Sequence, residues 1–133
     1  MSSRIRAKEK RLRRPVFFNL AQIQMPVVAL TSIIHRVTGV LLALGIPFSI
    51  YILELSLQSQ QSYTRLLGLF DKWAFKIAAI VFIWALAHHL LAGIRHLLSD
   101  IDVGSLLPAA RRSAWMVNVG GLAVALLAAG ALF

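Results

Sequence analysis

Residues 73–98 read WAFKIAAIVFIWALAHHLLAGIRHLL, and the first fifteen of these residues carry a single charge, Lys76. A helix needs about 20 mostly apolar residues to cross a hydrocarbon core roughly 30 Å thick. Comparable runs occupy residues 31–57 and 114–133. Since 59% of the 133 residues are hydrophobic, a soluble domain of this size could not bury them all. The sequence predicts an all-α integral membrane protein, with three transmembrane helices packed as a bundle in one membrane domain, residues 31–133.

The segments outside these spans are polar or basic. Residues 1–30 are expected to form a cytoplasmic basic tail followed by an interfacial segment, in which Pro26 prevents one continuous helix. Residues 58–72, which include QSQQSYTR, are expected to form a polar loop. A second loop is expected to extend from Asp100 to Pro108.

Details inside the spans predict how the helices start, bend and pack. Thr31 or Ser32 is placed to cap the first span. Pro47 should bend that helix, which membrane helices tolerate when neighbours satisfy the freed carbonyl. The third span is rich in small residues, among them Gly120 and Gly121, which allow close packing between membrane helices.

The charge pattern predicts orientation rather than nucleic-acid binding. The formal charge is +9, but seven of the fourteen basic residues lie in the first fourteen positions and two more, Arg111 and Arg112, precede the last span. By the positive-inside rule the N-terminus is cytoplasmic and the C-terminus lies across the membrane. The tail shows no organelle-targeting segment, which favours a bacterial cytoplasmic (inner) membrane over a mitochondrial inner membrane. The absence of cysteine excludes an iron–sulfur cluster held by this chain.

Two clusters of polar side chains lie within the spans, on the same predicted side of the membrane. An ionisable group inside a bilayer costs roughly 2.5–3.5 kcal/mol even on the lenient insertion scale, so such groups usually have partners and often functions. We expect the two clusters to converge on one site near the cytoplasmic face. Their members are Ser32, His35 and Arg36 in the first span, and His88, His89, Arg95 and His96 in the second.

Helical spacing separates the possible roles of these histidines. His89 and His96 are seven residues apart, on one helix face and about 10 Å from each other, with Gly93 between them. His89 lies deepest, and imidazole is the usual axial ligand of a low-spin heme. His96 cannot be the second ligand of the same iron, and we expect His35 to lie too near the interface to match His89 in depth. A six-coordinate heme would then need a ligand from another chain.

Structural roles remain open for the same residues. An intramembrane His can instead hydrogen-bond a neighbouring helix, and His88, offset by about 100° from His89, favours such a packing role. Arg36 and Arg95 can snorkel to lipid phosphates. Ser32 and Arg36 are four residues apart, so a hydroxyl and a guanidinium point the same way.

Two motifs in the chain resemble the cytochrome b subunit of succinate dehydrogenase. The first runs from Arg14-Pro15 to Ser32-Ile-Ile-His-Arg-Val-Thr-Gly39, and the second is His89-Leu-Leu-Ala-Gly-Ile-Arg-His-Leu-Leu-Ser-Asp100. Their order, their separation and the total length agree with that family over nearly the whole chain. Ser99 within the second motif and Asp102 just after it depart from the usual family pattern, and both lie past His89.

The resemblance implies a role for each motif residue. His89 would be the axial ligand of heme b, with the other ligand from a second, smaller membrane anchor subunit. Ser32 and Arg36 would bind ubiquinone, and His35 would contact a heme propionate, helped by Arg95 or His96. The segment after Arg14-Pro15 would dock on the iron–sulfur subunit.

The resemblance also implies the partners and the reaction. A flavoprotein subunit would oxidise succinate, iron–sulfur clusters would carry the electrons, and ubiquinone would be reduced at the anchor, which has no activity alone. Three alternatives remain open: the anchor of a quinol:fumarate reductase, a free-standing heme b electron carrier with both axial ligands in its own chain, and a structural anchor with neither heme nor quinone.

Overall fold

The computed structural model describes residues 25–133, and within that range the chain is helical, with no strand. The four helices are α2 (Val27–Gln58), α3 (Gln60–Phe70), α4 (Trp73–Asp100) and α5 (Leu107–Leu132). α2, α4 and α5 are each long and apolar enough to cross a membrane. The predicted all-α membrane fold with three spanning helices is confirmed. Predictions for residues 1–24, including Arg14-Pro15, lie outside the described residues.

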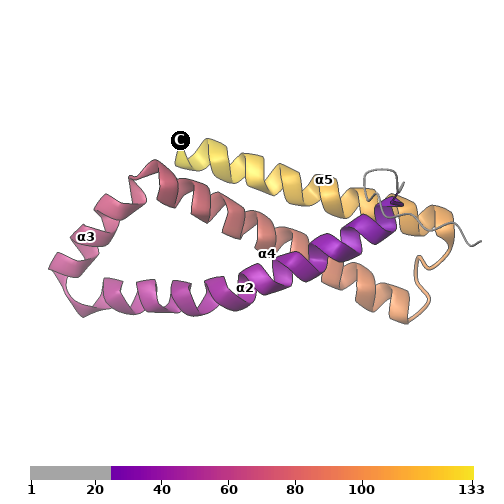
Figure 1. Cartoon of the computed structure of the whole chain (residues 1–133), viewed down its shortest axis with the longest axis horizontal. Helices are drawn as coiled ribbons and strands as arrows, with labels where there is room; N and C mark the ends of the chain where they lie inside the picture. The colour runs from indigo at the N-terminus through magenta and orange to yellow at the C-terminus, as the bar shows by residue number, and fades with distance from the viewer. Residues whose placement is uncertain (1–24) are drawn as a thin grey trace, which may run out of the picture.

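The helices form an elongated bundle (Figure 1). α2 contacts α4 and α5 near one end of it and separates from them toward the other. α5 lies along α4, and this pair makes the most extensive contact, while α2 crosses α4 near one end of the molecule. Toward the other end α2 and α4 diverge, and the short α3 connects them. Pro47 lies inside α2, and the two halves of this helix differ in direction in Figure 1, as expected for a helix bent at proline.

The segment predicted as a polar loop, residues 58–72, contains α3 instead, so that prediction was wrong. Ser59 begins α3 with a capping box, in which its hydroxyl accepts from the Ser62 amide and the Ser62 hydroxyl accepts from the Ser59 amide. The helix is amphipathic, and Leu66 on its apolar side is buried. The polar stretch QSQQSYTR concealed this helix because it supplies the cap and the first half of α3.

Two helix starts also differ from the sequence-based prediction. α2 begins at Val27 with Pro26 as N-cap, so neither Thr31 nor Ser32 caps it; the Thr31 hydroxyl donates to the Val27 carbonyl one turn back. α5 begins at Leu107 rather than Ala114. Pro108 does not prolong the loop, because proline is well suited to the first turn of a helix, where its missing N–H has no partner to lose.

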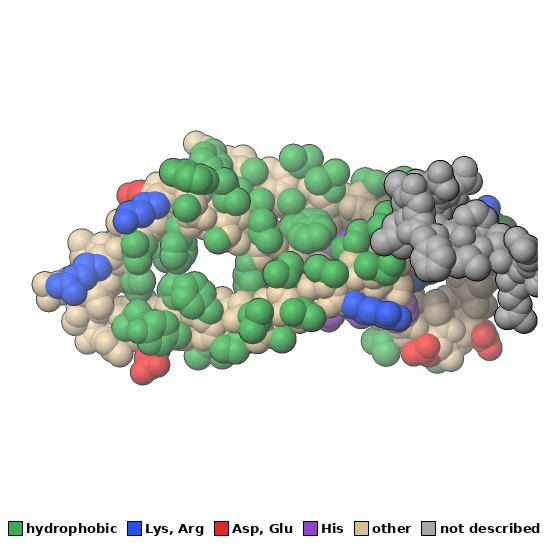
Figure 2. Space-filling model, viewed as in Figure 1, with side chains coloured by type: hydrophobic (Ala, Val, Ile, Leu, Met, Phe, Trp, Pro, Cys, Tyr) green, Lys and Arg blue, Asp and Glu red, His purple; other side chains and the backbone are tan. Residues whose placement is uncertain are grey.

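The interior of the bundle combines polar side chains with small apolar ones, whereas many large apolar side chains are exposed. The largest fully buried side chains are His88, Thr31 and Thr38, and hydrophobic side chains cover most of the visible outer surface (Figure 2). Gly121 allows α4 and α5 to approach, because a Cβ there would lie 3.2 Å from the His88 Cβ. This inverted distribution is what a lipid environment requires, since lipid gives apolar side chains no reason to be buried.

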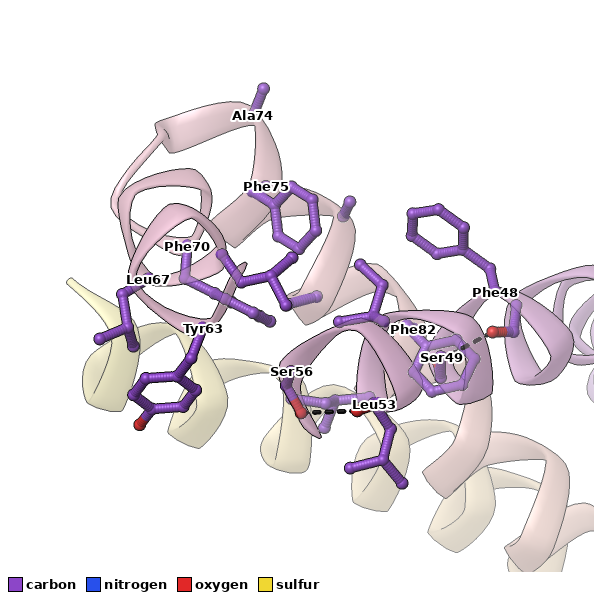
Figure 3. A pocket seen from close by; sticks show the side chains of 16 residues that line it. Phe48, Ser49, Leu53, Ser56, Tyr63, Leu67, Phe70, Ala74, Phe75 and Phe82 are labelled. Atoms are coloured by element: carbon purple, nitrogen blue, oxygen red, sulfur yellow. Dashed lines mark hydrogen bonds between the residues drawn. The ribbon is translucent and has the colours of Figure 1, made fainter. Parts of the chain in front are cut away.

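An apolar cavity of about 820 Å³ lies where α2 and α4 diverge, against α3 (Figure 3). Two of its hydroxyls are bonded within α2, since Ser49 donates to the Gly45 carbonyl and Ser56 donates to the Leu53 carbonyl. Phenyl rings such as Phe48, Phe75 and Phe82 make up much of the remaining wall. Among the described residues, no charged side chain lines this cavity, whereas the His and Arg residues predicted for the site lie toward the other end of the bundle.

Candidate functional site

Three imidazoles, from α2 and α4, lie together at the end where these helices cross. The rings of His35 and His89 stack with centroids 4.2 Å apart, and the rings of His35 and His96 are tilted with centroids 5.1 Å apart. The expectation that His35 lies too near the interface to match His89 was therefore wrong. Stacked rings present faces rather than nitrogens to each other, and within residues 25–133 no cluster of three His, Asp or Glu side chains is placed to hold a metal ion.

The contacts of His89 indicate which of its two ring nitrogens donates a hydrogen bond. Its Nδ1 lies 3.1 Å from the His35 carbonyl oxygen and 3.3 Å from the Thr38 hydroxyl. The Thr38 hydroxyl gives its own proton to the same carbonyl, at 2.9 Å, so both groups can only accept from the ring. Nδ1 is therefore the donor, and in the neutral ring Nε2 keeps the lone pair. An imidazole in this tautomer can bind a metal through Nε2.

Two glycines shape the surroundings of these rings. A Cβ on Gly39 would lie 3.1 Å from the His89 Cε1, so the ring fits against a bare stretch of α2 backbone. A Cβ on Gly93 would lie 3.8 Å from the His35 Nε2, an ordinary contact distance. Gly93 thus faces the His35 ring. That ring nitrogen is buried and has no hydrogen-bond partner among the described residues.

His88, next in sequence, points into the bundle and joins the three spanning helices. Its Nε2 lies 3.0 Å from the Oδ1 of Asn118 on α5, and the Thr31 hydroxyl on α2 lies 3.2 Å from the same oxygen. We call Thr31, His88 and Asn118 the polar junction. This geometry agrees with the packing role that the helical offset predicted for His88. Sequence analysis did not single out Asn118, an isolated polar residue in an Ala- and Gly-rich span.

Several of the remaining predicted residues line a basic cavity of about 580 Å³ at the same end of the bundle. Ser32, Arg95 and His96 line it, together with Arg111 and Ser99. Arg36 is exposed on α2 and is not among the lining residues. The structure thus brings both sequence clusters to one end, but only Ser32 of the proposed quinone pair contributes to the cavity wall.

Arg95 does not snorkel to the membrane surface. Its side chain is nine-tenths buried, its Nε donates to the Ser113 hydroxyl at 3.0 Å, and an Nη contacts the Ala110 carbonyl at 3.5 Å. Both partners are neutral and belong to the first two turns of α5. Ser113 and Ala110 were not identified from sequence, because small residues near a helix start carry no distinctive signal.

These features define a multi-pass membrane protein with three clustered imidazoles and a basic cavity beside them. Comparison with known proteins gives the same class. The family described as succinate dehydrogenase/fumarate reductase transmembrane subunit matches residues 10–128. The chain belongs to this family.

Similar proteins agree over most of their length. The succinate dehydrogenase cytochrome b556 subunit of Coxiella burnetii is 37% identical over 109 residues, which cover 80% of this chain and 86% of that protein. The protein of the same name from Paracoccus denitrificans is 32% identical over 114 residues, covering 86% and 88%. The one from Rickettsia prowazekii is 30% identical over 115 residues, covering 86% and 90%.

Proposed function

We propose that this chain is the membrane anchor that binds heme b and forms part of the ubiquinone site of a bacterial succinate dehydrogenase. The observation that carries the proposal is the position of His89 Nδ1 against two acceptors, the His35 carbonyl and the Thr38 hydroxyl, which would leave the lone pair of the neutral ring on Nε2. The name cytochrome b556 of the related proteins supports a b-type heme.

The second axial ligand would come from another chain. His35 is the imidazole in closest contact with His89, but its ring stacks face to face at 4.2 Å. That separation leaves no room for a porphyrin between the rings, so His35 cannot bind the opposite side of the same iron. This argues against a free-standing carrier with both ligands in one chain. It supports a heme shared with a second anchor subunit.

The heme propionates are assigned to the basic side chains that surround these rings. The His35 ring is in contact with the rings of both His89 and His96, and Arg95 and His96 line the adjacent cavity. Cationic and N–H donors favour carboxylates by charge-assisted hydrogen bonds. When bound, the heme would supply one-electron redox chemistry, and this chain would hold and orient it.

Ser32 and Arg36 are assigned to the ubiquinone headgroup. Ser32 is half-buried at the cavity wall, where its hydroxyl can donate to a quinone carbonyl. Arg36, one turn further along α2, is exposed on the surface where the partner subunits would complete the site. Its guanidinium would stabilise the more negative, reduced forms of the quinone. Electrons would arrive from succinate through flavin and iron–sulfur clusters in the soluble partner subunits.

Orientation and direction complete the proposal. The N-terminus would be cytoplasmic by the positive-inside rule, which places Ser32 near the water that supplies protons for quinone reduction. The family description includes fumarate reductases, so the reverse reaction is the second candidate. The names of the similar proteins favour succinate oxidation.

The test is a reduced-minus-oxidised optical spectrum of the purified complex, wild type beside His89→Ala, with succinate as reductant. We expect a b-type band that succinate reduces and that His89→Ala loses or shifts. His88→Phe is the matched control, because it removes the neighbouring imidazole that faces Asn118, and it should keep the band. A wild-type complex without the band would remove the heme assignment. The quinone assignment would then be tested separately, through the KM for quinone of Ser32→Ala and Arg36→Gln.

A further inference from the structure

Thr38 places a hydroxyl in the middle of the contact between α2 and α4. Its side chain is 0% exposed, and its hydroxyl donates to the His35 carbonyl, three residues back on α2, at 2.9 Å. That bond alone is the ordinary way in which a threonine is accommodated inside a helix. It uses the one proton of the hydroxyl and leaves the lone pairs of the oxygen available to a second partner.

The second partner is the imidazole of His89 on α4. The Thr38 Oγ1 lies 3.3 Å from His89 Nδ1, and the His35 carbonyl oxygen lies 3.1 Å from the same nitrogen. Since the hydroxyl proton is directed at the carbonyl, Oγ1 presents a lone pair to the ring. The N–H of His89 is thus shared between two acceptors, of which only Thr38 belongs to a side chain.

Acceptors at this nitrogen affect the opposite side of the ring. A hydrogen bond from the second nitrogen of a ligating imidazole fixes the orientation of the ring and raises its basicity as a ligand. A more electron-rich ligand stabilises the more positive, oxidised iron over the reduced iron. Hydrogen bonding around an axial ligand is therefore one of the means by which a protein sets the reduction potential of a heme.

We propose that Thr38 is a positioning residue for His89, and that the hydrogen bond it accepts from Nδ1 lowers the midpoint potential of the heme. This role depends on the proposed function, in which His89 is an axial ligand. The His35 carbonyl alone maintains the tautomer, and Thr38 adds to the basicity of the ring. The role belongs to the hydroxyl and not to the shape of the side chain, so an isosteric residue without the hydroxyl should lose it.

The experiment is a redox titration of the heme in the purified complex, with heme affinity measured in the same samples by competition with apomyoglobin. Thr38→Val keeps the β-branched shape and removes the hydroxyl, whereas Thr38→Ser keeps the hydroxyl. Thr31→Val is the matched control. Thr31 is equally buried on α2 and also donates to a carbonyl of its own helix, but its hydroxyl faces Asn118 instead of His89.

We expect Thr38→Val to raise the midpoint potential and to weaken heme binding about tenfold. Loss of a hydrogen-bond partner of a metal ligand costs roughly 10–100-fold in affinity, and the lower end applies because the His35 carbonyl remains. Thr38→Ser and Thr31→Val should keep the wild-type potential. An unchanged potential in Thr38→Val would overturn the proposal. So would a lowered potential, since the hydroxyl would then donate to the ring.

A complex of Thr38→Val that assembles without heme moves the decision to Thr38→Ser and Thr38→Ala, which differ in the hydroxyl alone. Higher heme content in Thr38→Ser would support the proposal, and equal loss in both would overturn it. A wild-type complex without a b-type band would remove the proposed function itself. A wild-type band whose potential Thr38→Val leaves unchanged would remove only the role of Thr38.

Discussion

Replacing Asn118 by leucine should destabilise the bundle by isolating a buried imidazole. His88 is 1% exposed, its Nδ1 has no hydrogen-bond partner in the described part of the chain, and its Nε2 bonds only to Asn118 Oδ1, at 3.0 Å. Asn118→Leu leaves both ring nitrogens buried and unpaired. Thr31 loses less, because its hydroxyl keeps the Val27 carbonyl at 2.9 Å.

The expected magnitude follows from that difference. A buried polar group that loses its partner costs about 1–3 kcal/mol, while side-chain hydrogen bonds between membrane helices average about 0.6 and reach about 1.7 kcal/mol. We therefore expect Asn118→Leu to cost about 1–2 kcal/mol. The double variant His88→Phe/Asn118→Leu removes both polar partners and keeps the volume, so it should cost less than the sum of the two single changes by about 1 kcal/mol.

The assay is SDS-induced unfolding of the purified complex in mixed micelles, with the midpoint and slope compared among wild type, both single variants and the double variant. The fluorescence of Trp84 is one reporter, because its ring lies 5.9 Å from the His88 ring. Additive costs in the double variant would refute the reasoning, since the hydrogen bond would then contribute no coupling between α4 and α5.

Three further predictions concern close contacts. Gly39→Ala should displace the imidazole of His89, because the new Cβ would lie 3.1 Å from its Cε1, and this should lower the heme content per complex. Gly68→Ala is the control, since a Cβ there meets nothing within 4 Å, and the heme content should stay unchanged. Gly121→Val should lower stability in the same SDS assay by about 1–3 kcal/mol through overpacking against α4, whereas Gly130→Val, in open space, should change it little. Lys76→Met should lower the free energy of unfolding by about 1 kcal/mol. The Lys76 ammonium donates to the Leu132 carbonyl at 2.6 Å and lies 5.2 Å from the centroid of the Phe133 ring. An unchanged SDS midpoint would show that these contacts contribute nothing.

The long apolar runs predicted the spanning helices because length and hydropathy alone determine what can cross a bilayer. Their ends were less predictable. Polar residues marked residues 58–72 as a loop, but the capping box at Ser59 and the packing of Leu66 produced α3. The start of α5 was placed too late because Pro108 predicts a turn as readily as a first helical turn.

The candidate site was predictable where helical spacing determines it and unpredictable where a contact joins two helices. The convergence of the two clusters followed from counting spans, and His88 was correctly separated from His89 by its offset. Thr38 and Asn118 were missed, because each acquires its role from a side chain more than twenty residues away. A single hydroxyl or amide in an apolar span has no pattern that reveals such a partner.

The backbone carbonyl and the side chain of His35 make different contacts with His89. Its carbonyl accepts from His89 Nδ1 at 3.1 Å and from Thr38 at 2.9 Å, while its ring stacks on the His89 ring at 4.2 Å. The carbonyl belongs to the α2 backbone and would hold the ligand tautomer whatever side chain stood at this position. The ring adds the stacking and a buried nitrogen without a partner among the described residues, so the histidine side chain would serve a polar contact, such as the proposed propionate, rather than the orientation of His89.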